Sequence, residues 1–170
     1  MPALFLCAAL VACGDDGGSD VTTEAGPLVP SKRDYIVQAD TICANSDQII
    51  ETEAEIRFKI DSSDFTVTPS GDIVFKPGRR PSDAEIERFA TQVILPAFRE
   101  QLADLRGLTP PAGDEVTVAE IYDAAEAGIG RLQGDPAIFS DSAAVRRELS
   151  EAQSLGRRYG FFNCGTYSAP

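Results

Sequence analysis

Apolar residues recur at every third or fourth position over long stretches of the chain. In the first stretch the apolar or small positions are Tyr35, Ala39, Ile42, Cys43, Ser46, Ile49, Ile50, Ala54, Phe58 and Ile60. This spacing places them on one face of an α-helix, so it predicts a single long amphipathic helix. Ser31, three residues before Asp34, supplies an N-cap and marks the start of the folded domain.

The second stretch with this period runs from Ile86 to Leu105. Ser82 and Glu85 precede it at the spacing of a capping box, and Gly107 ends it. Pro96 lies inside the stretch and has no backbone N–H to donate. We therefore expect either a kink at Pro96 or two shorter helices in place of one.

Two more helices are predicted towards the C-terminus. The third begins near Asp114 and ends at Gly134. The fourth follows Asp135–Pro136, where a capping residue precedes a proline at the first helical position, and it ends at Gly160. We expect this helix to be interrupted near Ser140.

The segment from Asp61 to Pro81 breaks the helical period and has the pattern of a short β-hairpin. Phe65–Thr68 and Ile73–Lys76 flank the turn sequence PSGD. An isolated hairpin is marginally stable in water, so we expect its apolar side chains to dock on the helices, with cover by a partner as the alternative. These side chains are Phe65, Val67, Ile73 and Phe75. Arg79 and Arg80 close the segment, and we expect them to be a solvated positive spot.

Together these elements predict a mainly all-α fold, an up-and-down four-helix bundle with a short β-hairpin-like insertion between the first and second helices. The folded domain spans residues 31–170. Small residues gather on its last two helices, at Ala124, Ala125, Gly128, Gly130, Ala143, Ala144, Ala152 and Gly156. Close helix packing is the simplest explanation, and a gap that admits an apolar ligand is the alternative.

Residues 1–12 form an apolar run that has the length of the hydrophobic region of a signal peptide and is too short to span a bilayer. No Lys or Arg precedes the run, which a start upstream of Met1 explains most simply. The run ends in Leu10, Val11, Ala12 and Cys13. This quartet resembles the bacterial lipobox, in which small apolar residues precede a lipid-modified cysteine. The resemblance implies cleavage after Ala12 and a lipid on the Cys13 sulfur, with a disulfide thiol as the alternative role of Cys13.

Residues 13–30 comprise this cysteine and a flexible linker that follows it. The linker is rich in Gly, Asp, Ser, Thr and Pro and has no apolar period, which is typical of a solvated tether. Two or three acyl chains on Cys13 anchor a protein much more firmly than a single chain does. A calcium site is the weaker alternative for the linker, because Asp15, Asp16 and Asp20 lack the spacing of a calcium loop.

Charge and composition narrow the classes of function. The 170-residue chain has a net charge of -12 and contains no His. The negative charge disfavours nucleic-acid binding, and the lack of His removes the commonest general base and transition-metal ligand. No serine-hydrolase, zinc-peptidase or P-loop motif is present, so we predict no enzyme, no catalytic residue, no cofactor and no metal. A hydrolase that uses acidic residues is less favoured, because the carboxylates of Glu51 and Glu55 lie on one helix face that is most simply solvated.

Cys43 and Cys164 are the two cysteines that follow Cys13. An even number of cysteines in an exported protein predicts a disulfide between them. In an up-and-down bundle the fourth helix ends beside the start of the first, so the segment after it can reach Cys43. Phe161 and Phe162 then seal this end of the bundle. A metal site is disfavoured, because no further soft ligands accompany the two thiols.

Three segments resemble small helical lipoproteins of actinobacterial type, namely YIVQADTIC from Tyr35, LPAFREQLADLRGLTPPAGDE from Leu95 and YGFFNCG from Tyr159. The resemblance implies a fold and a location, and it implies no activity. We therefore expect a protein that is lipid-anchored to the cell membrane and faces outside the cytoplasm. It would act as a non-catalytic binding or scaffolding module for an envelope protein or a cell-wall partner. A carrier of a small apolar ligand, with a pocket between the helices, is the alternative function.

Overall fold

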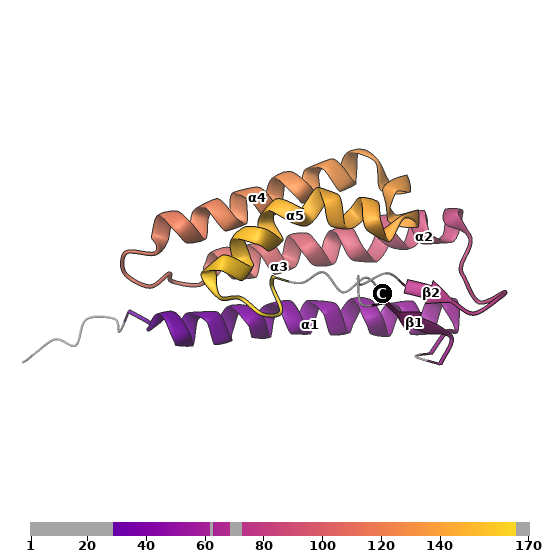
Figure 1. The fold of residues 1–170 in the computed structure, drawn as a ribbon, viewed down its shortest axis with the longest axis horizontal. Coiled ribbons are helices and arrows are strands. Elements are labelled where there is room, and N and C mark those ends of the chain that lie inside the picture. The colour runs from indigo at the N-terminus through magenta and orange to yellow at the C-terminus, as the bar shows by residue number, and fades with distance from the viewer. Residues whose placement is uncertain (1–28, 62, 69–72, 166–170) are drawn as a thin grey trace, which may run out of the picture.

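The computed structural model describes residues 29–61, 63–68 and 73–165. In these residues the chain is mainly helical, with four helices and a two-stranded antiparallel hairpin between the first and the second (Figure 1). The predicted fold class is therefore confirmed. The predicted signal peptide of residues 1–12, the lipid site at Cys13 and most of the predicted linker lie outside the described residues.

The first helix, α1, spans Lys32–Phe58 and buries most of the predicted stripe. The Ser31 hydroxyl accepts a hydrogen bond from the backbone N–H of Asp34, as the cap pattern predicts. One position of the stripe is wrong, because Ile49 is 57% exposed whereas Ile50 is buried. Adjacent residues on a helix point about 100° apart, and α1 turns Ile50 toward the core and Ile49 toward solvent.

The second helix is continuous but changes its winding in the middle. It consists of α2 (Asp83–Phe89), the π-helical turn η1 (Ala90–Ile94) and α3 (Leu95–Gly107). The predicted capping box of Ser82 and Glu85 is present. The N–H of Leu95 donates to the carbonyl of Ala90, five residues earlier. This wide turn comes directly before Pro96 and gives room for the proline ring, so the helix continues through Pro96 and is not divided into two separate helices.

The third and fourth helices are α4 (Glu115–Gly134) and α5 (Ser142–Tyr159), with the 3-10 turn η2 (Pro136–Ser140) between them. The expected interruption near Ser140 is confirmed, and Pro136 opens the 3-10 turn instead of an α-helix. The Asp141 carboxylate accepts hydrogen bonds from two backbone N–H groups in the first turn of α5. Gly160 ends α5 at a φ of 119°, in the left-handed region that favours glycine.

The hairpin consists of β1 (Phe65–Val67) and β2 (Ile73–Phe75). Its strands are antiparallel, with Phe65 opposite Phe75 and Thr66 opposite Val74. Each strand is one residue shorter than predicted. The hairpin lies beside the C-terminal end of α1 (Figure 1).

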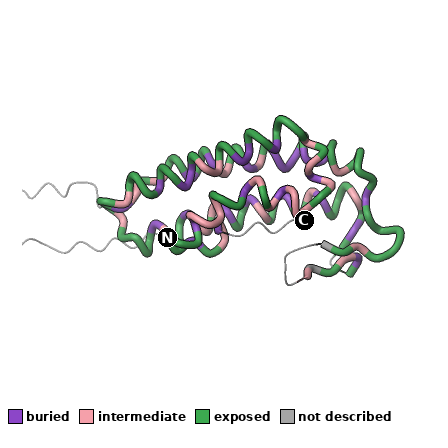
Figure 2. The backbone as a smooth tube through the Cα atoms, turned by 45° about the horizontal axis from the view of Figure 1, so that its top comes forward, coloured by how far each residue is buried: buried purple, intermediate pink, exposed green. Residues whose placement is uncertain are grey.

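Close packing of α4 against α5 depends on Gly128. A Cβ atom at this position would lie 2.7 Å from the carbonyl oxygen of Glu148 and 2.9 Å from the side chain of Leu149. Any larger residue would push the two helices apart. Close helix packing therefore explains why a glycine occupies position 128. On the other side of the bundle α1 packs against α3. Buried positions face the inside along all four helices (Figure 2), and the largest of the fully buried side chains are Tyr35, Leu132, Val118, Val145 and Cys43.

The two ends of the bundle hold different structures (Figure 1). At one end α1 begins and α5 ends, and we call this the clasp end. At the other, the hairpin end, α1 ends and the hairpin, α2 and η2 meet. The 27 residues of α1 make it ~40 Å long, which sets the distance between the two ends. None of the helices in the described part of the chain has both the length and the hydropathy of a transmembrane span.

Candidate functional site

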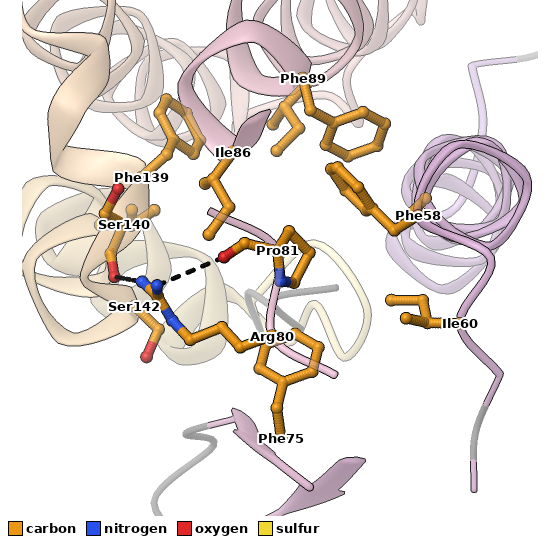
Figure 3. A pocket seen from close by; sticks show the side chains of 13 residues that line it. Phe58, Ile60, Phe75, Arg80, Pro81, Ile86, Phe89, Phe139, Ser140 and Ser142 are labelled. Carbon is orange, nitrogen blue, oxygen red and sulfur yellow. Dashed lines mark hydrogen bonds between the residues drawn. The ribbon is translucent and has the colours of Figure 1, made fainter. Parts of the chain in front are cut away.

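A cavity of about 100 Å³ lies at the hairpin end of the bundle. Its apolar wall is formed by Phe58, Ile60, Phe75, Ile86, Phe89 and Phe139. Figure 3 shows these side chains converging from α1, the hairpin, α2 and η2. Four separate parts of the sequence therefore build one apolar site.

The helices hold two sides of this cavity rigidly. The rings of Phe58 on α1 and Phe89 on α2 meet edge to face, with centroids 5.1 Å apart. Phe139 is 8% exposed, because η2 turns it into the bundle just before α5 begins. Ile60 follows the left-handed residue Lys59, whose φ of 51° ends α1 and redirects the chain toward the hairpin. The cavity thus lies where the chain changes direction after α1 and again at η2.

The hairpin supplies the remaining side. Phe75 lines the cavity, and its ring lies 6.0 Å from that of Phe65 on the paired strand. Both phenylalanines are half-buried, and neither packs against the buried core of the described helices, so docking of the hairpin on the helices stays a prediction. The side chains of Val67 and Ile73 lie outside the described part of the structure.

An ion pair fixes the base of the hairpin. Arg79 donates from Nε and Nη2 to the two carboxylate oxygens of Asp64, at 2.8 Å and 2.6 Å, and also from Nη2 to the carbonyl of Lys59 at 2.8 Å. These hydrogen bonds hold the pKa of Asp64 below its ordinary value. The expectation that Arg79 is only solvated is therefore wrong. The fork of the guanidinium matches the two oxygens of one carboxylate, and the turn brings that carboxylate within reach.

Arg80 lies at the mouth of the cavity, and the expectation of a merely solvated side chain is wrong here as well. Its Nη2 lies 2.8 Å from the Asp83 carboxylate and donates to the carbonyl of Ser140 at 3.1 Å (Figure 3). Ser140 and Ser142 also line the mouth. The site therefore has an apolar interior and a polar rim, which suits an apolar group attached to a polar chain.

The clasp end contains the predicted disulfide. Cys43 and Cys164 are bonded, with their Cα atoms 5.3 Å apart. The Asp40 carboxylate reinforces the bond by accepting hydrogen bonds from the backbone N–H groups of Phe162, at 2.9 Å, and of Cys164, at 3.0 Å. Phe161 is 3% exposed and seals this end as expected, but Phe162 is 77% exposed. The expectation for Phe162 is wrong because its backbone turns toward Asp40 and its side chain faces outward.

Three tyrosines form a buried polar network at the clasp end that the sequence analysis did not identify. The hydroxyls of Tyr35 and Tyr122 lie 2.6 Å apart, and that of Tyr159 donates to the Asp114 carboxylate at 2.8 Å. Burial raises the pKa of Tyr122 and of Tyr159 above the ordinary value. Lys32 lies over the Tyr159 ring, 3.9 Å from its centroid. The sequence did contain a signal for this network, because three of the four tyrosines lie on the apolar stripes of the predicted helices.

The alternative explanation of the small residues, a gap between the last two helices, is also supported by an observation. Ala125 on α4 and Ala152 on α5 line a second cavity, of about 90 Å³, in the middle of the bundle.

Glu51 and Glu55 on α1 are exposed, which fits a solvated face. In the described part of the chain, no group of three or more His, Cys, Asp or Glu side chains is arranged to hold a metal ion.

Comparison with known proteins adds no relative to this picture. No protein-family model matches the chain, and neither a curated protein nor a solved structure matches it. Its function is therefore to be inferred from its residues and their geometry.

Proposed function

We propose that this chain is a lipid-anchored lipoprotein that faces outside the cytoplasm and acts as a non-catalytic binding module of the cell envelope. The observation that carries the proposal is the apolar cavity with a polar rim at the hairpin end. Its inner wall offers no nucleophile and no acid to a bound group. It does offer buried apolar surface, which drives association in water.

The position of this cavity agrees with an anchor at Cys13. The segment that precedes α1 enters the bundle at the clasp end, and α1 then runs ~40 Å to the hairpin end. A lipid on Cys13 would hold the clasp end nearer the membrane. The cavity would then face the space outside, where proteins and cell-wall components are available.

The size of the cavity points to one apolar side chain of a protein partner. A cavity of ~150 Å³ admits a benzene molecule, and drug-sized ligands occupy ~300–1,000 Å³. A volume of about 100 Å³ fits a branched aliphatic side chain and cannot enclose a lipid tail. The carrier alternative is therefore less well supported than the binding module.

Site-specific crosslinking in native membranes tests this site. A photoreactive residue in place of Ser142, at the rim, should capture a partner in the intact lipid-anchored chain. The same residue in place of Val116, which is 72% exposed near the clasp end, is the matched control. Ala54→Leu places extra carbon atoms into the cavity from its α1 side and should abolish capture at 142. Identical capture at both positions, or capture at 142 that survives Ala54→Leu, would rule the site out.

The anchor has its own test. Cys13→Ala should leave the chain without acyl chains and release it from the membrane fraction, or leave its signal uncleaved. Intact-mass analysis of the mature wild-type chain decides the matter. A mature N-terminus other than Cys13, or a mass without acyl chains, would contradict the lipoprotein proposal.

A further inference from the structure

The cavity in the middle of the bundle differs in chemistry from the one at the hairpin end. Helices α1, α3, α4 and α5 and the segment that follows α5 all contribute to it. Leu102, Ile129 and Leu149 form part of its apolar wall, and the Cys43–Cys164 disulfide borders it. Unlike the first cavity, it is also lined by a carboxylate and three side-chain amides.

Asp47 is the single charged residue in this lining, and it is half-buried. Among the described residues, no donor lies within hydrogen-bonding distance of its carboxylate, and no cation pairs with it. Burial raises the pKa of Asp47 to about 6, and the nearby charge of Glu51 adds to this effect. The carboxylate is therefore mostly ionised at neutral pH, and no partner in the described part of the chain offsets its partial removal from water.

The amides do not supply that partner. Gln101 directs its Nε2 at the sulfur of Cys43, at 2.9 Å, and Asn163 donates to the carbonyl of Asp40 at 3.2 Å. The side chain of Gln153 on α5 makes no hydrogen bond with any described residue, so its amide oxygen is a second acceptor in the lining. A group that carries several N–H donors and a positive charge would satisfy both acceptors.

We propose that this cavity binds a small primary alkylammonium ion, with the ammonium group against Asp47 and the short alkyl chain among Leu102, Ile129 and Leu149. The ammonium has three donors for the carboxylate and amide oxygens, and the apolar wall removes the alkyl chain from water. A volume of about 90 Å³ limits that chain to a few carbon atoms. The net charge of -12 raises the concentration of cations around the whole molecule.

The test uses the full lipid-anchored chain in detergent and n-butylammonium as the probe. At pH 7.5 and constant ionic strength, n-butylammonium should raise the unfolding midpoint in a saturable way. 1-Butanol and butyrate, which match its length without the positive charge, should not. In a second measurement, the methyl NMR signals of Ile129 should shift on titration, whereas those of Ile86 in the hairpin-end cavity should stay in place.

Asp47→Asn is the decisive variant, and it should weaken binding of n-butylammonium by about tenfold or more. This variant should fold, since it removes a half-buried charge that has no partner. Glu51→Gln is the matched control, because Glu51 is exposed one turn further along α1 and does not line the cavity. The proposal is overturned if Asp47→Asn binds like the wild type, if 1-butanol binds equally well, or if calcium at the same concentration stabilises the chain more than n-butylammonium. None of these outcomes bears on crosslinking at position 142.

Discussion

The clasp end and the hairpin end of this bundle are held together by different kinds of interaction. At the clasp end a disulfide, the Asp40 carboxylate and a network of tyrosine hydroxyls join α1 to α4 and to the segment after α5. At the hairpin end Arg79 ties the base of a short hairpin to Asp64 and to the Lys59 carbonyl, beside a cavity whose wall contains the Phe58–Phe89 ring pair. The bonds at the clasp end join segments that are distant in the sequence, whereas the ion pair at the hairpin end joins residues only 15 positions apart. We infer that the clasp end contributes more to global stability than the hairpin end, whereas the two cavities lie at the hairpin end and in the middle of the bundle.

The largest effect is expected from the disulfide. Its loss in Cys43→Ala/Cys164→Ala, or its reduction, should lower the free energy of unfolding by ~2–4 kcal/mol, because the bond closes a loop over a sequence separation of 121 and restricts the unfolded chain. Urea unfolding with and without reductant measures this. Each single variant should expose a thiol that pairs between molecules. Two titratable thiols per oxidised, denatured chain would show that the bond is not formed.

The second-largest loss in the free energy of unfolding is expected from changes in the tyrosine network. Tyr35→Phe removes the partner of the buried Tyr122 hydroxyl, and leaving that hydroxyl unpaired should cost ~1–3 kcal/mol in the free energy of unfolding. The double variant Tyr35→Phe/Tyr122→Phe leaves no unpaired hydroxyl in this pair and should recover most of the loss. Urea unfolding of the wild type, the single variants Tyr35→Phe and Tyr122→Phe, and the double variant gives the coupling between the two residues. Additive effects would mean that the hydroxyls do not interact.

Asp47, between the two ends, should give the bundle a smaller dependence on pH. Its pKa of about 6 in the folded chain lies above its ordinary value of 3.8. Between these two values the folded chain retains a proton that the unfolded chain has lost, so the free energy of unfolding should fall as the pH rises through this interval. Asp47→Asn should remove this decline and be the more stable chain at pH 7. Glu51→Gln, which removes only the lesser cause of the shift, should keep most of the decline.

The smallest effect on global stability, and the most local one, is expected at the hairpin. Arg79→Ala removes the hydrogen bonds to Asp64 and to the carbonyl of Lys59, so amide hydrogen exchange should accelerate in β1 and β2. Exchange in the segment 160–165 at the clasp end should not change. Arg80→Ala is the matched control, because Arg80 bonds to Asp83 and Ser140 and not to the hairpin. Equal acceleration at both ends would show that they form one cooperative unit.

The features that the sequence predicted are those that depend on neighbours in the chain. Helix stripes, the Ser82 capping box and the stop at Gly160 follow from local spacing and backbone preference. The pairing of Cys43 with Cys164 needed one further assumption, that the helices alternate in direction. That assumption is correct here.

The missed features depend on contacts between distant segments. Arg79 has the same local pattern as Arg80, and only the folded turn shows that Asp64 is its partner. The inward and outward positions of Phe161 and Phe162 follow from the place of Asp40, far away in the chain. Each cavity is space that remains unfilled where side chains from several distant elements meet, and no periodicity of the sequence encodes such a space.

The bond between Cys43 and Cys164 also determines the order in which the domain can be completed. Synthesis proceeds from the N-terminus, so the thiol of Cys43 is present throughout the addition of the next 121 residues. During that interval α1 can pair with α3, but its covalent partner does not yet exist. A mispaired or capped Cys43 would therefore leave α1 packed against α3 without its covalent bond. A chain that contains the Cys43–Cys164 bond has, in turn, been synthesised beyond the end of α5.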